Sequence, residues 1–231
     1  MRRLLVKRFE SSFGAFSKSI DRFSKVHKIV REFIDTSGGK YILDRKLIES
    51  IYSFDEDEIE SALETFEQEL TKKKVPKNNR VYSVDWFRLR WVFISDIEND
   101  IALFEQLQSE IRDLDIVNND PKRVEIFENV KAIVDDKKDN RKVIIFSEFV
   151  DTVKHLEEYF REKFGNRLLV CDGKITKQFA KHLNENFNAQ HKGNQEDQFD
   201  VLITSDKLAE GFNLNRAGAV SYTHPEPTRP Y

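Results

Sequence analysis

Cysteine is nearly absent from this sequence of 231 residues, with Cys171 as its single representative. One thiol forms no internal disulfide, so the sequence favours a reducing compartment, and we expect the cytoplasm. Long apolar runs are missing too, since none approaches the ~20 residues that a membrane-spanning helix needs. The charged stretch from Met1 to Arg8 leaves no room for the apolar segment of a signal peptide. We therefore expect no membrane partner.

An excess of charge of one sign is lacking as well. The chain has 38 basic and 41 acidic residues, which gives a net charge of −3. This balance neither requires nor excludes a nucleic-acid partner, because a basic groove can coexist with acidic faces. Phenylalanine, by contrast, is abundant with 19 copies, and we expect these rings to fill a core.

The sequence also has no phosphate-binding loop of the kind that ends in Lys-Ser or Lys-Thr. Gly39-Lys40 is followed by Tyr41, and Gly173-Lys174 is followed by Ile175. An aspartate-glutamate pair that could hold magnesium after a strand is missing too. The histidines, His155 among them, show no metal-ligand spacing, so we expect surface imidazoles and no metal site.

Helical periodicity dominates the first half of the chain. Apolar residues recur there at steps of three and four, which places them on one helix face: Phe9, Phe13, Phe16, Ile20, Phe23, Val26, Val30 and Phe33. Ser37-Gly38-Gly39 ends this helix. Further helices are expected at about 55–74, along the stripe from Phe87 to Leu114, and from Pro121 after an Asp120 cap. Trp86 and Trp91 are assigned to the core of that stripe.

At Lys142 the pattern changes to short apolar runs that alternate with amphipathic helices. The runs are 143–146, 168–171 and 201–203, and the helices are 150–164 and about 176–187. This alternation predicts an α/β fold with a parallel sheet buried on both faces. We therefore expect a mainly helical region at 1–140 and a parallel-sheet domain at 141–231, with Cys171 as a core thiol.

Polar residues follow each predicted strand. The three strand ends continue into Ser147-Glu148, Asp172-Gly173-Lys174 and Thr204-Ser205-Asp206. Ligands of open parallel sheets bind outside these carboxyl ends, so the three segments should line one rim. Hydroxyls, glycine and an ammonium can donate to phosphate, and a carboxylate can accept from a ribose hydroxyl. Such residues also occur as ordinary helix caps, and for Thr176 that interpretation is equally good.

The order and spacing of these segments resemble the C-terminal, RecA-like lobe of superfamily-two helicases, and most closely that of Swi/Snf-type bacterial helicase-related proteins. Residues 142–149 resemble motif IV, and 200–214 resemble motif V. The segment from Leu5 to Phe16 is similar to the stretch that joins the two lobes in that group.

The resemblance implies a role for each matching residue. The residues expected to contact nucleic acid are Ser147, Gly173, Lys174, Thr204 and Ser205. Those expected at nucleotide or interlobe contacts are Asp206, Glu210 and Gly211. DNA is favoured over RNA, and ATP with Mg²⁺ is expected only in a complete two-lobe protein.

Two departures from the family pattern lead us to expect a fragment that is inactive alone. The first RecA-like lobe is missing, and the sequence stops before the segment that supplies arginine fingers, with Arg229 in the preceding turn. One alternative is a catalytically silent module that binds nucleic acid or protein through its helical region. Another is an unrelated domain for a small phosphorylated ligand, but residues 147–150 lack the glycine that it requires.

Overall fold

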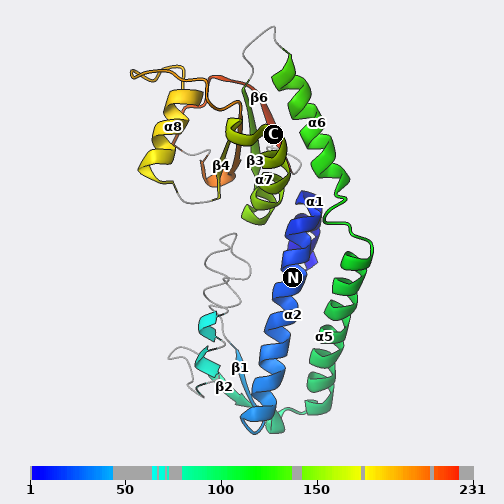
Figure 1. Ribbon diagram of the computed structural model, residues 1–231. Helices are drawn as coiled ribbons and strands as arrows, with labels where there is room; N and C mark the ends of the chain where they lie inside the picture. The colour runs from blue at the N-terminus through cyan, green and yellow to red at the C-terminus, as the bar shows by residue number, and fades with distance from the viewer. Residues whose placement is uncertain are drawn as a thin grey trace, which may run out of the picture. The chain divides into compact units, whose positions relative to one another are not determined.

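The computed structural model describes residues 2–43, 64–66, 68–70, 72, 80–136, 142–172, 175–208 and 211–223, which form two compact units (Figure 1). The helical unit is Ser17–Val117, and the sheet unit consists of Arg2–Phe16 together with the chain from Asn118 on. The sequence predicted one boundary near residue 140. In the structure, the N-terminal segment and the chain from Asn118 onwards group with the sheet instead.

The sheet unit is built on four parallel strands in the order β4-β5-β3-β6. The strands are β3 (Lys142–Ser147), β4 (Leu168–Cys171), β5 (Val201–Ser205) and β6 (Ala217–Tyr222). All three predicted apolar runs are strands, and β3 and β5 are buried along their whole length. Continuous burial is what a parallel sheet covered on both faces requires.

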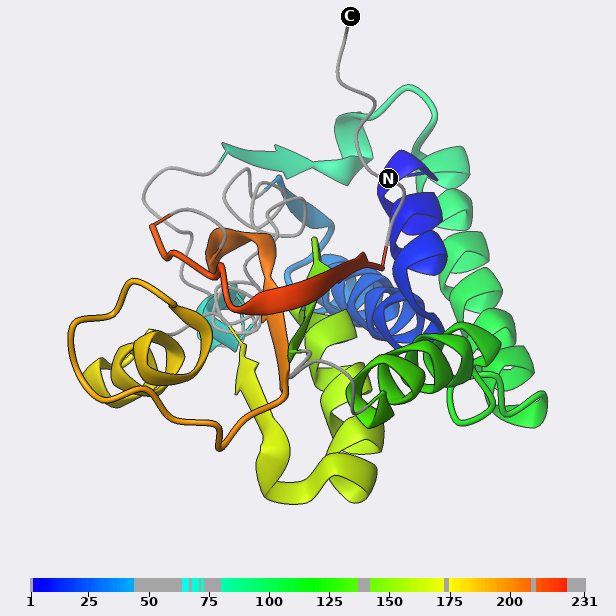
Figure 2. The ribbon, with the colours of Figure 1, turned by 90° about the horizontal axis from the view of Figure 1, so that it is seen from above.

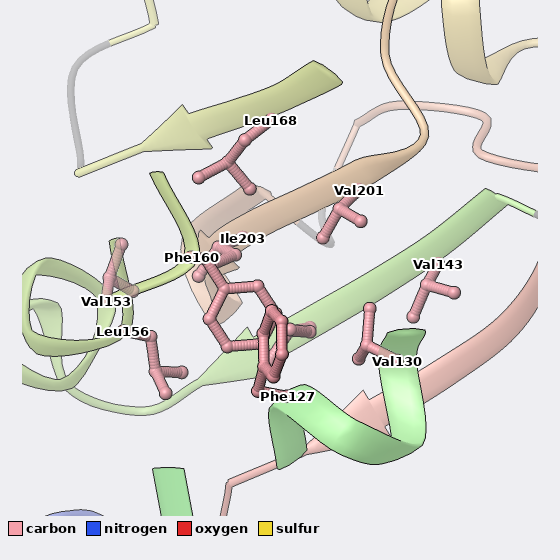
Figure 3. Close-up of a cluster of buried hydrophobic side chains, with 10 residues drawn as sticks. Phe127, Val130, Val143, Val153, Leu156, Phe160, Leu168, Val201 and Ile203 are labelled. Carbon is pink, nitrogen blue, oxygen red and sulfur yellow. The ribbon is translucent and has the colours of Figure 1, made fainter. Parts of the chain in front are cut away.

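Helices cover both faces of this sheet (Figure 2). α6 (Pro121–Asp135) and α7 (Val150–Phe164) pack on one face, and α8 (Lys177–Phe187) packs on the other. Side chains alternate along β3, so Val143 and Ile145 join the first cluster, whereas Ile144 and Phe146 join the second. Figure 3 shows the first cluster, in which Phe127 of α6 meets Phe160 of α7. The predicted α/β class with a parallel, RecA-like sheet is confirmed.

Local sequence signals set the ends of these helices. The Asp120 side chain accepts the backbone N–H groups of Lys122 and Arg123, so it caps α6 as predicted. Thr176 accepts the N–H of Phe179 and caps α8. α7 ends at Gly165, whose φ of +54° favours glycine, and the short helix η2 (Gly165–Arg167) leads into β4. Cys171 is buried, as expected.

The predicted N-terminal helix is interrupted at Ser12. α1 (Arg2–Ser11) ends there, and α2 (Phe13–Thr36) begins. The Ser12 hydroxyl accepts the N–H of Ala15 at 3.0 Å, and the N–H of Phe13 donates to Asp120 Oδ2 at 3.1 Å. These side chains take backbone groups that a continuous helix would pair internally, and α2 therefore starts with its own cap.

The core face expected for the first helix is correct in part. Ile20, Phe23 and Phe33 are buried, but Phe9 is 48% exposed. The Phe9 ring packs against Phe13 and Phe16 at centroid distances of 5.1 and 5.3 Å, so it covers part of the helix surface instead of entering the core.

The helical unit pairs α2 with α5 (Arg90–Asp113), and a two-stranded antiparallel sheet lies at one end of the pair (Figure 1). That sheet consists of β1 (Lys40–Leu43) and β2 (Arg80–Ser83), and the short helix η1 (Val84–Trp86) follows β2. Gly38 and Gly39 have φ values of +72° and +81°, which confirms the predicted end of α2. Of the helix expected at 55–74, residues 64–66 and 68–70 are helical, and the remainder, Lys72 apart, lies outside the described residues.

Contacts between α2 and α5 show that the two helices are antiparallel. Phe23 stacks on Phe104 with a centroid distance of 6.0 Å, and Arg31 forms an ion pair of 2.8 Å with Glu98. Exposed ion pairs contribute only about 0–1 kcal/mol each. The buried aromatic and aliphatic contacts therefore stabilise this pair more than its charges do.

Two residues assigned to the core by sequence lie at the surface. Trp86 is 90% exposed and Trp91 is 76% exposed, so that prediction was wrong. The apolar stripe of α5 does face α2, as the burial of Ile97, Phe104 and Ile111 shows, but neither tryptophan belongs to it. Among the described residues, no helix is both long enough and apolar enough to cross a membrane.

Gly14 is required by the close packing of the N-terminal segment on α7. A Cβ atom at this position would lie 2.6 Å from Cγ of His155, well inside van der Waals contact. His155 was expected at the surface but is only 7% exposed, because its ring fills this site.

Substitution Gly14→Ala should therefore destabilise the sheet unit by about 1–3 kcal/mol through overpacking. In a His155→Gly background the same change should be neutral or stabilising, since the ring and the Cβ of residue 155, which would lie 2.6 and 2.9 Å from the added Cβ, are both gone, and alanine favours helix over glycine by about 1 kcal/mol. Urea unfolding followed by circular dichroism measures both effects. Equal costs in the two backgrounds would show that Gly14 and His155 are not in contact.

Candidate nucleic-acid and nucleotide interface

The carboxyl ends of the parallel strands meet at one edge of the sheet. Ser147, the last residue of β3, is the register partner of Ser205, the last residue of β5. Cys171, which ends β4, is paired with Thr204. The structure thus brings together three of the predicted site residues. Gly173, Lys174 and Glu210 lie outside the described residues.

The three hydroxyl side chains at this edge are buried. Ser147 and Thr204 are 0% exposed and Ser205 is 4% exposed. Ser147 Oγ accepts the N–H of Phe149 at 3.3 Å and the hydroxyl of Thr223 at 3.0 Å. Ser147 therefore has a structural role that the sequence did not reveal, and its contact with nucleic acid stays a prediction.

Thr204 and Ser205 differ in how their hydroxyls are satisfied. Thr204 Oγ1 donates to the carbonyl of Ser205 at 3.2 Å. The buried Ser205 Oγ has no hydrogen-bond partner among the described residues. A buried hydroxyl without a partner costs about 1–3 kcal/mol, so Ser205 is the polar group of this edge with the most to gain from a ligand.

The chain after β5 carries the residues predicted for nucleotide or interlobe contacts. Asp206 opens the short helix η3 (Asp206–Leu208) and is exposed, whereas Leu208 is buried and anchors the turn. Gly211 has a φ of +114°, a conformation that residues with a Cβ rarely adopt. The backbone at this position therefore favours glycine, and the nucleotide or interlobe contact expected of Gly211 stays a prediction. No group of three potential metal ligands is found in the described part of the chain.

The N-terminal segment contacts the start of α7 and Glu148, which lies just before it. We call this set of interactions the α1–α7 contact. Lys7 Nζ lies 2.8 Å from Glu148 Oε1, and Arg8 Nη1 lies 2.8 Å from Asp151 Oδ2. The Arg8 guanidinium also stands 4.7 Å from the centre of the Phe149 ring. Arg8 was expected on a solvated helix end, but it is only 1% exposed.

Hydroxyl groups continue this contact into the sheet. Thr152 Oγ1 forms hydrogen bonds of 2.9 Å with the hydroxyls of Ser11 and Ser12. Ser11 is also bonded to Thr223 at 3.2 Å, and Thr223 to Ser147 at 3.0 Å. All five side chains are at least nine-tenths buried. This hydroxyl chain links α1, α7, the end of β3 and the residue that follows β6.

Asp120 anchors the same region electrostatically. Burial alone would raise the pKa of its carboxyl, but the nearby His155 and the backbone N–H groups of Phe13 and Arg123 outweigh burial and lower the pKa. His155 Nε2 lies 3.3 Å from Asp120 Oδ2. Asp120 thus stays ionised and joins three helices, α2, α6 and α7.

Most of this polar set could not be predicted from the sequence, because helical periodicity is a pattern of apolar residues only. Arg8, Asp151 and Thr152 have no local signature that distinguishes them from solvated helix positions. One signal was present: residues 7–14 combine two basic residues, two serines and a glycine within two helical turns. That combination is unusual for a helix that only presents a phenylalanine face.

Comparison with known proteins assigns this part of the chain. Residues 125–228 match the family model of the helicase conserved C-terminal domain. The matched region starts within α6 and contains the entire parallel sheet, so match and fold together support a RecA-like helicase C-terminal lobe. No curated protein matched the chain.

The hydrogen bond between Ser147 and Thr223, at the sheet end of the hydroxyl chain, can be tested by substitution. Ser147→Ala and Thr223→Val should each cost about 1–3 kcal/mol, because each leaves buried partners without a hydrogen bond. The double variant should cost less than the sum, since both changes remove the same bond. Urea unfolding measures the three values, with exposed Ser95→Ala as a control that changes little. Additive costs would contradict the bond between Ser147 and Thr223.

Proposed function

We propose that this chain provides the second RecA-like lobe of an ATP-dependent nucleic-acid translocase related to the bacterial Swi/Snf group. The observation that supports this most directly is the coincidence of the helicase match with the parallel sheet. Within that sheet, β3 and β5 end side by side at Ser147 and Ser205, where ligands of open sheets bind.

In this proposal the nucleotide is bound between two lobes. Enzymes of phosphoryl transfer act chiefly by positioning and by electrostatic stabilisation, so residues on both sides of the phosphates matter. Asp206, Glu210 and Gly211 would contribute from this lobe, and ATP with Mg²⁺ would be held jointly with a first lobe that carries a phosphate loop. Support comes from the exposure of Asp206 directly after β5 and from the positive φ of Gly211.

Nucleic acid would approach the carboxyl edge. Because the hydroxyls of Ser147, Thr204 and Ser205 are buried, a phosphate would first meet the segments that follow the strands. In the sequence, β4 is followed by Gly173 and Lys174, and we propose that they contribute a backbone N–H and an ammonium. We propose DNA ahead of RNA, on the family resemblance.

The α1–α7 contact suggests how the two lobes would be coupled. Residues 5–16 resemble the interlobe stretch of the family, and here they form part of the sheet unit through a buried ion pair and several hydroxyl bonds. Removing one partner of a buried ion pair costs about 3–5 kcal/mol. We propose that α1 therefore moves with this lobe as one body when the first lobe closes.

The purified chain should bind DNA weakly and without ATP turnover. Binding should fall as salt rises, because each phosphate contact releases condensed counterions. Fluorescence anisotropy of labelled single-stranded and duplex DNA between low and moderate salt measures this, and a coupled assay measures ATP hydrolysis. DNA-stimulated turnover by this chain alone would contradict the requirement for a first lobe.

Supplying a first RecA-like lobe together with the arginine-finger segment should restore turnover. Asp206→Ala should then reduce kcat at least about tenfold, which corresponds to ~1.4 kcal/mol. Glu158→Ala, which removes an exposed carboxylate of α7, is the matched control and should have no effect. Equal activities of the two variants would exclude Asp206 from the nucleotide or interlobe contact.

A further inference from the structure

Both tryptophans of the chain are exposed, and they lie on one short segment of the helical unit. Trp86 ends η1 and Trp91 is the second residue of α5. Between and beside them, Leu89 is 64% exposed and Val92 is 50% exposed. A single exposed apolar residue needs no explanation, but four within seven positions indicate a surface that binds something.

The segment that carries the tryptophans is held firmly in place. Val84 is 1% exposed, and its N–H donates to the carbonyl of Gly39 at 2.8 Å. Between the tryptophans, Phe87 packs edge-on against Phe93 at 5.1 Å, and the N–H of Arg90 donates to the Phe87 carbonyl. The exposed rings thus stand on an anchored backbone, so little conformational entropy is lost when they bind.

The charge around these rings is basic, although the whole chain is acidic. Between Val84 and Val92 the chain has Arg88 and Arg90 against Asp85, a net charge of +1, whereas the whole chain carries −3. Arg88 is exposed. The Arg90 guanidinium lies 4.9 Å from the centre of the Trp91 ring and also forms an ion pair of 2.5 Å with Asp85.

Aromatic faces combined with arginines favour one class of occupant. Single-stranded nucleic acid presents flat bases that stack on tryptophan and phosphates that attract guanidinium groups, without any need for sequence readout. Tryptophan and arginine are also frequent in protein interfaces, so the preference for nucleic acid follows from the helicase C-terminal match within the same chain. The two tryptophans are five residues apart, so their Cα atoms are at most about 18 Å apart. A strand of a few nucleotides can reach both.

We propose that Trp86 and Trp91, with Arg88 and Arg90, form a base-stacking site for single-stranded DNA or RNA on the helical unit. The site lies at the end of the α2–α5 pair that carries β1 and β2 (Figure 1). From Ser17, where the chain enters this unit, α2 extends 20 residues to Thr36, which is about 30 Å. The proposal places a separate nucleic-acid contact on the helical unit, and it rests on the proposed function in taking nucleic acid as the ligand of this chain.

Intrinsic fluorescence gives a direct test, because the chain contains no other tryptophan. Titration of the full chain with a 12-nucleotide oligothymidylate, at low salt, should quench the tryptophan emission as bases stack on the rings. An abasic deoxyribose-phosphate strand of the same length carries the same charge without bases and should quench far less. Oligouridylate distinguishes RNA from DNA at the same site.

Affinity is measured separately by anisotropy of a labelled oligothymidylate. Trp86→Ala and Trp91→Ala should each weaken binding about 5- to 150-fold, the range expected for the loss of one stacked base. Trp86→Phe should retain most of the affinity, because phenylalanine also stacks. Leu103→Ala, an exposed apolar residue of α5 that is 51% exposed, is the control and should not change affinity. Circular dichroism verifies that each variant is folded.

The outcomes separate this site from the proposed function. Oligothymidylate that binds by anisotropy without quenching, and equally well to both alanine variants, would overturn the stacking site and leave the sheet edge as the binding surface. Equal quenching by the abasic strand would show that the phosphates alone cause the quenching. That result would also overturn the stacking site. Absence of binding to any strand at low salt would overturn both proposals together.

Discussion

The buried ion pair between Arg8 and Asp151 is the interaction on which the architecture of the sheet unit depends. It fixes a segment from the start of the chain against the first turn of α7, and the hydroxyls of Ser11, Ser12 and Thr152 complete the contact. Two charges removed from water need close geometry and further hydrogen bonds to be tolerated, and both are present here. As a result, the end of β3, the start of α7 and α1 form one rigid polar core next to the proposed nucleic-acid edge.

The sequence was a good guide to the sheet unit and a poor guide to what completes it. Apolar runs predicted β3, β4 and β5, because a strand that is buried on both faces must be apolar along its whole length. Asp120 before Pro121 predicted the cap of α6. The shared edge of Ser147 and Ser205 followed from parallel topology. Burial of those hydroxyls did not follow, because the partner that covers Ser147 is Thr223, 76 positions away. Long-range polar pairing leaves no periodic trace in a sequence.

For the two tryptophans, hydrophobic periodicity predicted burial where the structure shows exposure. Hydrophobic periodicity along α5 assigned Trp91 to the core because it lies near apolar neighbours, but only the face with Ile97 and Phe104 meets α2. A helix with a partner on one side has room for one apolar stripe, and any further large side chain must face outward. Both tryptophans therefore lie at the surface beside arginines, where we propose that they bind a ligand instead of packing in the core.

The contact between the Phe13 N–H and the Asp120 carboxylate has an evolutionary consequence. The Phe13 nitrogen and Asp120 Oδ2 are only 3.1 Å apart. The whole helical unit, Ser17–Val117, lies in the chain between these two residues. Because the entropy of closing a loop grows only logarithmically, doubling such an insert costs about 0.6 kcal/mol. The closure entropy at this junction therefore changes little with the length of the segment between the two positions. Relatives that share the Arg8–Gly14 segment and the α7 start should differ most in length between these two anchor points.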